Sequence, residues 1–344
     1  MDMKQNTVAK LRAPYLLFLG DIEDESYSKT GSGLLEWCPD QVAGQIRLPG
    51  CGVDLKIPEL TITEAAAQGI GSLVISITPI GGQLPDDWRP AILEAIAAGI
   101  DIVSGLHSKL ADDPEFVAVA ENSGAKLVDV RTPPTDIPVG TGAKRTGKRA
   151  LMVGTDCAVG KKYSALALTR AMHDMGIKAT FRATGQTGIM IAGEGIAVDA
   201  VIADFVSGAA ELLSPDNDAG HWDVIEGQGS LYNPGYAGVT LGLIHGSQPD
   251  ALVLCHEAKL TRIIGWADYA IPPLDECMDT YLRMAKLTNP NVKFAGLSIN
   301  TSKLSADDRR SYLDRLSEQM NLPCVDPIID GSAAIARHLI DTMD

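Results

Sequence analysis

A strand, a glycine-bounded loop and a helix follow one another in the stretch "RALMVGTDCAVGKKYSALALTRAM", residues 149–172. The apolar run at 150–153 predicts a buried strand, and the aliphatic spacing from Lys161 onward predicts a helix. Backbone N–H groups of such a loop converge with the N-terminus of the following helix, an arrangement that favours a bound phosphate group. A strand–loop–helix unit of this kind is typical of a mainly parallel sheet that is covered by helices, so we expect this architecture around it.

The rest of the chain repeats this alternation of short apolar runs and helical patterns. In the first half we expect strands over 15–21, 72–77, 101–106 and 126–131, and helices over 88–98 and 115–123. The segment 132–149 is rich in Pro, Gly, Thr and cations and predicts a linker. Beyond it we expect strands over 150–153, 178–185, 221–229, 250–256 and 292–300, and helices from 161 and over 306–320. A chain of 344 residues with this pattern predicts two α/β domains.

Composition argues against several classes of function. A formal charge of -15 repels polyanions, so we expect no nucleic-acid partner. No apolar run reaches ~18 residues and the N-terminal segment has no secretory pattern, so we expect a soluble cytoplasmic protein with no membrane partner. The six cysteines are scattered and form no C-x-x-C pair, so no metal site is expected. An anionic ligand must therefore be held by local features rather than by the overall charge.

The loop departs from the strict P-loop pattern G-x-x-x-x-G-K-[ST] at two positions. Thr155 stands where the first glycine belongs, and Lys162 stands where a magnesium-coordinating hydroxyl belongs. Because phosphoryl transfer depends on that metal, the double lysine favours a loop that holds an anion without hydrolysing it. A plain glycine turn between strand and helix is the alternative. The expected cofactor-binding residues are Gly154, Thr155, Asp156, Cys157, Ala158, Val159, Gly160, Lys161, Lys162 and Tyr163.

The run "VGTDCAVGK" resembles the phosphate loop of dethiobiotin synthetases, which read Gly-Thr-Asp-Thr-x-Val-Gly-Lys-Thr after a strand. Further on, "ATFRATGQTG" and "VIEGQGSL" occupy the places of that family's second strand and of its Glu-Gly-Ala-Gly strand end. Three positions differ, because Cys157, Lys162 and Arg182 replace Thr, Thr and Lys. Together with the first-half pattern, the resemblance implies an α/β protein with an N-terminal Rossmann-like parallel-sheet domain, residues 1–140, followed by a P-loop NTPase-like domain, residues 141–344.

A second resemblance covers essentially the whole chain. It rests on "SGLHSKLADDPEF", "DVR", "GTDCAVGK", "ATGQTGI", "AGEGIAVDAVIADFVSGAAE" and "VIEGQGSLYNPGYAGVTLGLIHGSQPDALVLCHE", in this order. These motifs resemble a family long catalogued as a domain of unknown function, some of whose members are D-glutamate N-acetyltransferases. The resemblance implies a homo-oligomer that transfers acetyl from acetyl-CoA to a small acidic amino acid, D-glutamate. Two other functions stay open: an ATP-dependent ligase or kinase like dethiobiotin synthetase, and a nucleotide-binding regulator without turnover.

N-acetylation needs a base that deprotonates the substrate ammonium, and three residues are candidates for the catalytic base. Glu226 and His256 end expected strands, at the sheet edge where ligands of α/β proteins bind. A magnesium- or amide-binding acid and a structural imidazole are the alternatives for these two. Asp204 shares an otherwise apolar, helix-like run with Asp199, where acids are either buried with partners or line a site.

The substrate carboxylates call for cations. Arg182 ends an expected strand and offers a bidentate fork, with a surface ion pair as the alternative. Arg131 ends a strand of the first domain and is the second candidate. The hydroxyls and amides of "ATGQTG" complete the expected pocket through Thr184, Gln186 and Thr187.

Two further residues have expected roles at the cosubstrate. Asn300 follows a late strand and is a candidate contact for adenine. A thiol at a helix N-terminus has a lowered pKa, so Cys157 could take the acetyl group covalently, but its backbone amide is the favoured contact.

Overall fold

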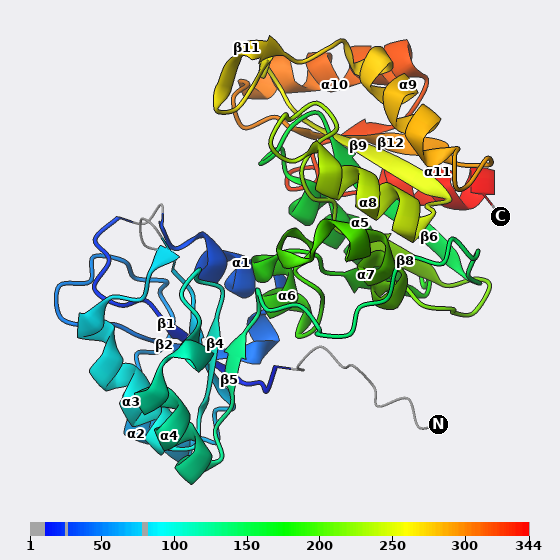
Figure 1. The fold of residues 1–344 in the computed structure, drawn as a ribbon. Helices are drawn as coiled ribbons and strands as arrows, with labels where there is room; N and C mark the ends of the chain where they lie inside the picture. The colour runs from blue at the N-terminus through cyan, green and yellow to red at the C-terminus, as the bar shows by residue number, and fades with distance from the viewer. Residues whose placement is uncertain (1–10, 25–26, 78–81, 344) are drawn as a thin grey trace. The chain divides into compact units, whose positions relative to one another are not determined.

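The computed structural model describes residues 11–24, 27–77 and 82–343, which form two compact units (Figure 1). The first unit comprises residues up to 135 together with 185–200, and the second comprises 136–184 together with 201–344. The chain therefore passes from one unit to the other three times. Within the described ranges, none of the helices combines the length and the apolar character that crossing a bilayer requires.

The first unit is built on a five-stranded sheet in which every pairing is parallel, in the order β2-β1-β3-β4-β5. Its strands are β1 (Tyr15–Phe18), β2 (Val42–Ile46), β3 (Ser72–Ile75), β4 (Asp101–Ser104) and β5 (Leu127–Asp129). Its helices are α1 (Lys29–Trp37), α2 (Ile62–Ala67), α3 (Arg89–Ala97), α4 (Pro114–Ser123) and α6 (Gln186–Ala192). The parallel α/β sheet expected for the first half is confirmed, with shorter strands than the pattern indicated.

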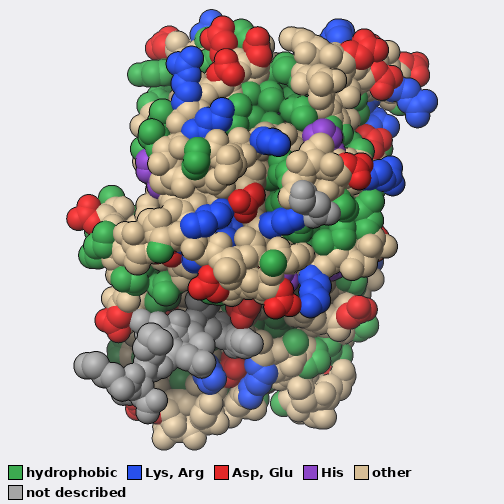
Figure 2. All heavy atoms as spheres, turned by 90° about the vertical axis from the view of Figure 1, so that its right-hand side faces the viewer, with side chains coloured by type: hydrophobic (Ala, Val, Ile, Leu, Met, Phe, Trp, Pro, Cys, Tyr) green, Lys and Arg blue, Asp and Glu red, His purple; other side chains and the backbone are tan. Residues whose placement is uncertain are grey.

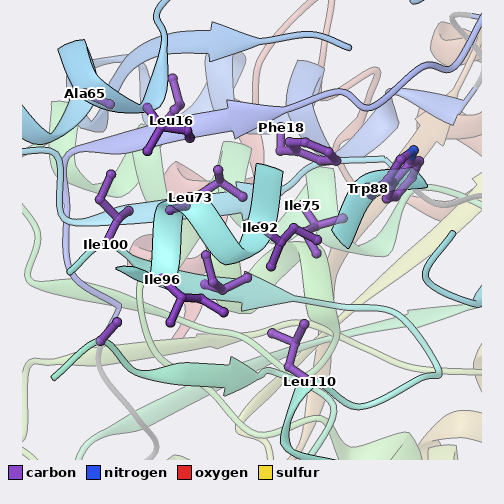
Figure 3. Close-up of a cluster of buried hydrophobic side chains, with 14 of the residues drawn as sticks. Leu16, Phe18, Ala65, Leu73, Ile75, Trp88, Ile92, Ile96, Ile100 and Leu110 are labelled. Carbon is purple, nitrogen blue, oxygen red and sulfur yellow. The ribbon is translucent and has the colours of Figure 1, made fainter. Parts of the chain in front are cut away.

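One face of this sheet carries the main core of the first unit. Figure 3 shows Leu16 and Leu73 of the strands facing Ile92 and Ile96 of α3. Helices α2 and α4 add their own apolar side chains to the same cluster. Because fully burying one such side chain stabilises a fold by about 1.5–3 kcal/mol, this face decides where α2, α3 and α4 lie. The ends of two of these helices are also set locally, by a capping box at Thr61 and by Asp113 before Pro114.

The second unit has a six-stranded sheet, again parallel at every pairing, in the order β13-β12-β9-β6-β8-β7. Its strands are β6 (Lys148–Gly154), β7 (Ala179–Arg182), β8 (Trp222–Ile225), β9 (Ala251–Glu257), β12 (Lys293–Asn300) and β13 (Cys324–Val325). Its helices are α5 (Lys161–Asp174), α7 (Val206–Leu213), α8 (Ala237–Ser247), α9 (Leu274–Ala285), α10 (Ala306–Met320) and α11 (Ala333–Met343). A short antiparallel hairpin, β10 (Arg262–Ile263) and β11 (Trp266–Ala270), stands apart from the main sheet.

Side chains of this second sheet alternate between two cores. Met152 and Val253 face α5 and α11, whereas Leu151, Val153 and Leu252 face α8, α9 and α10. A central strand buried on both faces must be apolar throughout, as the run at 150–153 is. The phosphate loop thus follows an interior strand that is paired with β9 on one side and β8 on the other.

The expected linker 132–149 lacks regular structure as far as residue 147, but much of it is tied to the second unit. Glu211 accepts the backbone N–H groups of Thr141 and Gly142, both at 2.9 Å. Arg145 donates to the carbonyl oxygens of Ser214 and Gly246, each at 2.7 Å, near the ends of α7 and α8. Composition predicted a linker, and the structure shows that Thr141, Gly142 and Arg145 of this segment are hydrogen-bonded to the second unit.

Candidate functional site

The phosphate loop runs from the end of β6 to the start of α5. Ala158 and Gly160 hold positive φ angles of 56° and 99°, which turn the backbone sharply before the helix begins at Lys161. Lys161 is 7% exposed, and its Nζ donates to the carbonyl oxygen of Asp156 at 2.8 Å. Burial lowers the pKa of this ammonium group. A cation held in this way next to a helix N-terminus is ready to pair with a bound anion.

The end of β8 lies directly against the loop. A Cβ on Gly227 would stand 1.7 Å from the carbonyl oxygen of Met152 and 3.0 Å from the Cδ of Lys161. Only glycine permits this close approach. The expected neighbourhood of the "VIEGQG" and "GTDCAVGK" motifs is therefore confirmed by the packing of their backbones.

Asp156 joins three separate segments of the second unit. Its carboxylate is fully buried and accepts hydrogen bonds from the backbone N–H of Cys157 (2.7 Å), Nδ2 of Asn233 (2.9 Å) and the backbone N–H of Ile264 (2.6 Å). The loop after β8 and the β10–β11 hairpin are thus both tied to the phosphate loop. Sequence reasoning placed Asp156 in the loop but did not find Asn233 or Ile264, because nothing in the local spacing links them to it.

Glu226 follows β8 immediately and is buried. One carboxylate oxygen accepts the backbone N–H of Thr184 at 2.8 Å, and the Thr184 hydroxyl donates to the carbonyl oxygen of Glu226 at 2.7 Å. Gln228 donates to the same hydroxyl at 3.2 Å. The charge of Glu226 acts on the ammonium of Lys161 and raises its pKa, against the larger effect of burial. Two predicted site residues, Glu226 and Thr184, are therefore in direct contact beside the phosphate loop.

His256 lies within β9, one residue before its end, and is 5% exposed. Its Nδ1 is 2.9 Å from the hydroxyl of the loop residue Thr155. Burial lowers the pKa of His256 to about 4, so the imidazole is neutral at pH 7. A neutral imidazole next to the phosphate loop has one nitrogen able to accept a proton.

The two aspartates expected in a helix-like run are separated by the fold. The run forms two short 3-10 turns, Val198–Ala200 and Ala203–Phe205, so the expectation of one helix is wrong. Asp199 belongs to the first unit and Asp204 to the second, where it is exposed. The exposed position of Ile202 explains the difference, since the run does not bury a continuous apolar face.

Three predicted substrate-binding residues meet in the first unit. Arg131 donates to Oε1 of Gln186 at 3.1 Å and forms an ion pair with Asp199 at 2.7 Å. The hydroxyl of Thr187 lies 3.2 Å from that of Thr30. Arg131 follows β5, so this group lies at the carboxyl edge of the first sheet, the usual ligand-binding edge.

Arg182 and Asn300 end strands of the second sheet, and both have partners. Arg182 is the last residue of β7, and its Nε donates to the buried carboxylate of Asp223 at 2.8 Å. Asn300 ends β12 and donates to Glu257 at 3.3 Å. Their expected roles toward carboxylate and adenine stay predictions.

The remaining loop residues differ in exposure and charge. Burial raises the pKa of the Cys157 thiol, which works against a thiolate that would take an acetyl group. The ammonium of Lys162 lies 4.4 Å from the ring centroid of Tyr163. Among the described residues no group of three or more His, Cys, Asp or Glu side chains is placed to hold a metal ion. On the face shown in Figure 2, Lys and Arg side chains are interspersed with Asp and Glu side chains.

Two family models match this chain. Residues 138–336 match a domain of unknown function described as the DUF1611_C P-loop domain, and residues 46–133 match the DUF1611_N Rossmann-like domain. Both the family expected from the motifs and the two expected domain types are confirmed.

Known proteins are similar over nearly the full length. A D-glutamate N-acetyltransferase of Tritonibacter scottomollicae is 49% identical over 97% of this chain and 99% of its own length. A second D-glutamate N-acetyltransferase, from a Pseudoalteromonas species, is 46% identical over 96% of this chain and 99% of its own. A crystal structure of a DUF1611 family protein from Anabaena variabilis ATCC 29413 superposes with a TM-score of 0.82 at 32% identity, covering 96% of this chain and 100% of that one.

Proposed function

The chain belongs to the DUF1611 family, and from that premise we propose that it is an N-acetyltransferase acting on D-glutamate, with acetyl-CoA as the donor. The observation that carries the proposal is the 49% identity to a D-glutamate N-acetyltransferase along 97% of the chain. Identity spread over both units supports a shared activity better than a match confined to one domain would.

In this proposal the phosphate loop binds the pyrophosphate of coenzyme A, which anchors the donor and does not itself react. Lys161 supplies a buried positive charge beside the amides of a helix N-terminus. Lys162 stands where phosphoryl-transfer enzymes carry a hydroxyl for magnesium, and acyl transfer does not need the phosphates to react. The loop chemistry therefore suits a donor whose nucleotide end is bound but left unchanged.

The reaction moves one proton before the new bond forms. The substrate ammonium gives a proton to a base, and its nitrogen then attacks the thioester carbonyl carbon. As the C–N bond forms the C–S bond breaks, the nitrogen gives up its second proton to the departing thiolate of coenzyme A, and the base releases the first proton to solvent. Glu226 is the base that we favour over His256 and Asp204, because it is a buried carboxylate beside the phosphate loop, whereas Asp204 is exposed.

Arg131, in the first unit, and Arg182, in the second, are the candidates for the carboxylates of the acceptor. The guanidinium of Arg131 is oriented by Gln186 and Asp199, so little rotamer freedom is left to lose on binding. Arg182 already pairs with the buried Asp223, and a move toward a substrate would leave that carboxylate with the Ser214 hydroxyl at 2.6 Å but without this cation.

A thiol-release assay tests the proposal. The purified chain is mixed with acetyl-CoA and D-glutamate, and free thiol is followed together with the mass of the amino-acid product. Thiol released only when both substrates are present, with N-acetyl-D-glutamate as the product, is the expected result. Magnesium-dependent ADP release from ATP without thiol would overturn the proposal in favour of a ligase or kinase.

A further inference from the structure

An aromatic wall stands next to the phosphate loop, formed by Tyr236, Ile264 and Trp266, and we call it the hairpin wall. The rings of Tyr236 and Trp266 meet edge to face with centroids 6.1 Å apart. Gly235 lets the indole approach, since a Cβ there would lie 3.2 Å from two of its ring atoms. The β10–β11 hairpin and the loop after β8 are therefore packed on each other.

Both of these segments are fixed to the phosphate loop by Asp156. Its buried carboxylate binds Asn233 in one segment and the N–H of Ile264 in the other. Removing a buried hydrogen-bonded carboxylate would leave both donors without their partner. The hairpin wall is thus held at a set position relative to the residues that we propose bind the pyrophosphate.

Much of the hairpin wall is exposed although it is apolar. Tyr236 is 52% and Ile264 48% exposed. Ile328 and Ile329 are also exposed, but their backbone N–H groups bind Asp326, and no described hydrogen bond joins them to the phosphate loop. The hairpin wall combines an accessible apolar surface with a direct link to the anion-binding loop.

We propose that the hairpin wall is the subsite for the pantetheine arm of coenzyme A, an inference that rests on the proposed function. A donor held by its pyrophosphate leaves an arm with a branched dimethyl carbon, and burying that carbon against aromatic rings is favourable. Asp156 is then a positioning residue, because it fixes the distance between the pyrophosphate contacts and the apolar contacts.

The test compares two ligands that share a pyrophosphate, of which ADP lacks both the pantetheine arm and the 3′-phosphate of coenzyme A. Calorimetry measures binding of coenzyme A and of ADP to the wild-type chain and to Trp266→Ala. We expect the variant to bind coenzyme A at least roughly tenfold more weakly and ADP as before. The KM for acetyl-CoA rises by the same factor, while the KM for D-glutamate stays within about twofold.

Tyr269→Ala is the matched control. Tyr269 is 52% exposed on the same hairpin, and its side chain points to the opposite face of β11 from Trp266. The Tyr269→Ala variant should bind both coenzyme A and ADP with the affinity of the wild-type chain. Ile264→Ala, a milder change to the hairpin wall, should move coenzyme A binding in the same direction as Trp266→Ala if the latter folds poorly.

Three results would overturn the inference. Equal weakening of coenzyme A and ADP would mean that the hairpin only supports the loop, and unchanged binding of both would mean that it does not touch the donor. A Trp266→Ala variant that changes sedimentation while the KM for acetyl-CoA stays fixed would assign the hairpin wall to contact between copies. Failure of the proposed function looks different, since the wild-type chain would then release no thiol.

Discussion

The two sheets share one architecture but differ in the charges that they bury. In the described part of the first unit, Asp101 is the one Asp, Glu, Lys or Arg among the fully buried polar residues. The second unit buries Asp156, Lys161 and Glu226 around one loop, with His256 beside them. Burying a charge is costly unless it is paired or used, so the contrast supports our proposal that the reaction takes place at the carboxyl edge of the second sheet.

The difference in buried charge also shows that the shared architecture does not decide how each sheet edge is used. Both sheets are parallel, and ligands of open parallel sheets generally bind outside the carboxyl ends of the strands. At the edge of the first sheet the polar groups pair with each other, as Arg131 does with Asp199. The polar groups at the first edge are thus held by one another, whereas those at the second edge surround the phosphate loop.

The largest effect should come from Glu226→Gln, which keeps the size of the side chain and removes its basicity. We expect kcat to fall roughly 10²–10⁴-fold, with the KM for acetyl-CoA little changed. Steady-state thiol release measures both constants. Glu211→Gln makes the same substitution where the carboxylate binds the backbone of Thr141 and Gly142, and it should leave kcat intact. A loss below tenfold in Glu226→Gln would transfer the role of base to His256.

Lys161→Ala comes next and addresses binding rather than turnover. Removing a buried cation that pairs with an anion should weaken coenzyme A binding roughly 100-fold, as calorimetry can measure. Lys162→Ala is the control, and because Lys162 is less buried its loss should cost up to about fivefold. Equal affinities in the two variants would contradict our account of the loop.

Acid should destabilise the second unit through His256. Its pKa lies near 4 in the fold against 6.5 when unfolded, so between these values the unfolded chain binds more protons and stability falls as pH drops. From pH 7.5 to pH 5 this group alone should remove about 2 kcal/mol from the free energy of unfolding. Urea unfolding at both pH values measures it, and His256→Asn should remove that part of the pH dependence. An identical pH dependence in the variant would show that other groups cause it.

Arg131→Lys tests the role of the carboxyl edge of the first sheet, and its expected effect is the smallest. If the first edge recognises the acceptor, the KM for D-glutamate rises roughly tenfold while the KM for acetyl-CoA stays constant. Asp199→Asn removes the ion-pair partner without touching the cation. Should both variants lower the melting temperature alike and leave the KM for D-glutamate unchanged, Arg131 only holds the fold.

Sequence alone predicted the elements that have strong periodicity. The run at 150–153 and the helix 306–320 were found because apolar spacing and turn residues agree there. Helix α6 was missed, since Gly188 and Thr187 are weak helix formers, and the burial of Ile189, Met190 and Ile191 decides its structure.

The site was only partly predictable for a similar reason. Motif spacing predicted the loop, Glu226 and His256 near one edge of a sheet, and the structure has the loop after β6, Glu226 after β8 and His256 one residue before the end of β9. The partners of Asp156 come from residues 77 and 108 positions away in the chain, and only the folded structure brings them together. Likewise, the pairing of Arg182 with Asp223 depends on the register of β7 against β8.

The assignment of residues 185–200 to the first unit has a consequence for synthesis on the ribosome. Domains generally fold as the N-terminal part emerges, but here the partners of Arg131 and Thr30 are encoded beyond the first long stretch of the second unit. At a synthesis rate of ~5–20 residues per second, several seconds pass between the synthesis of the last strand of the first sheet and that of α6. During that time its carboxyl edge lacks the helix, and a chain cut after residue 135 would never acquire it.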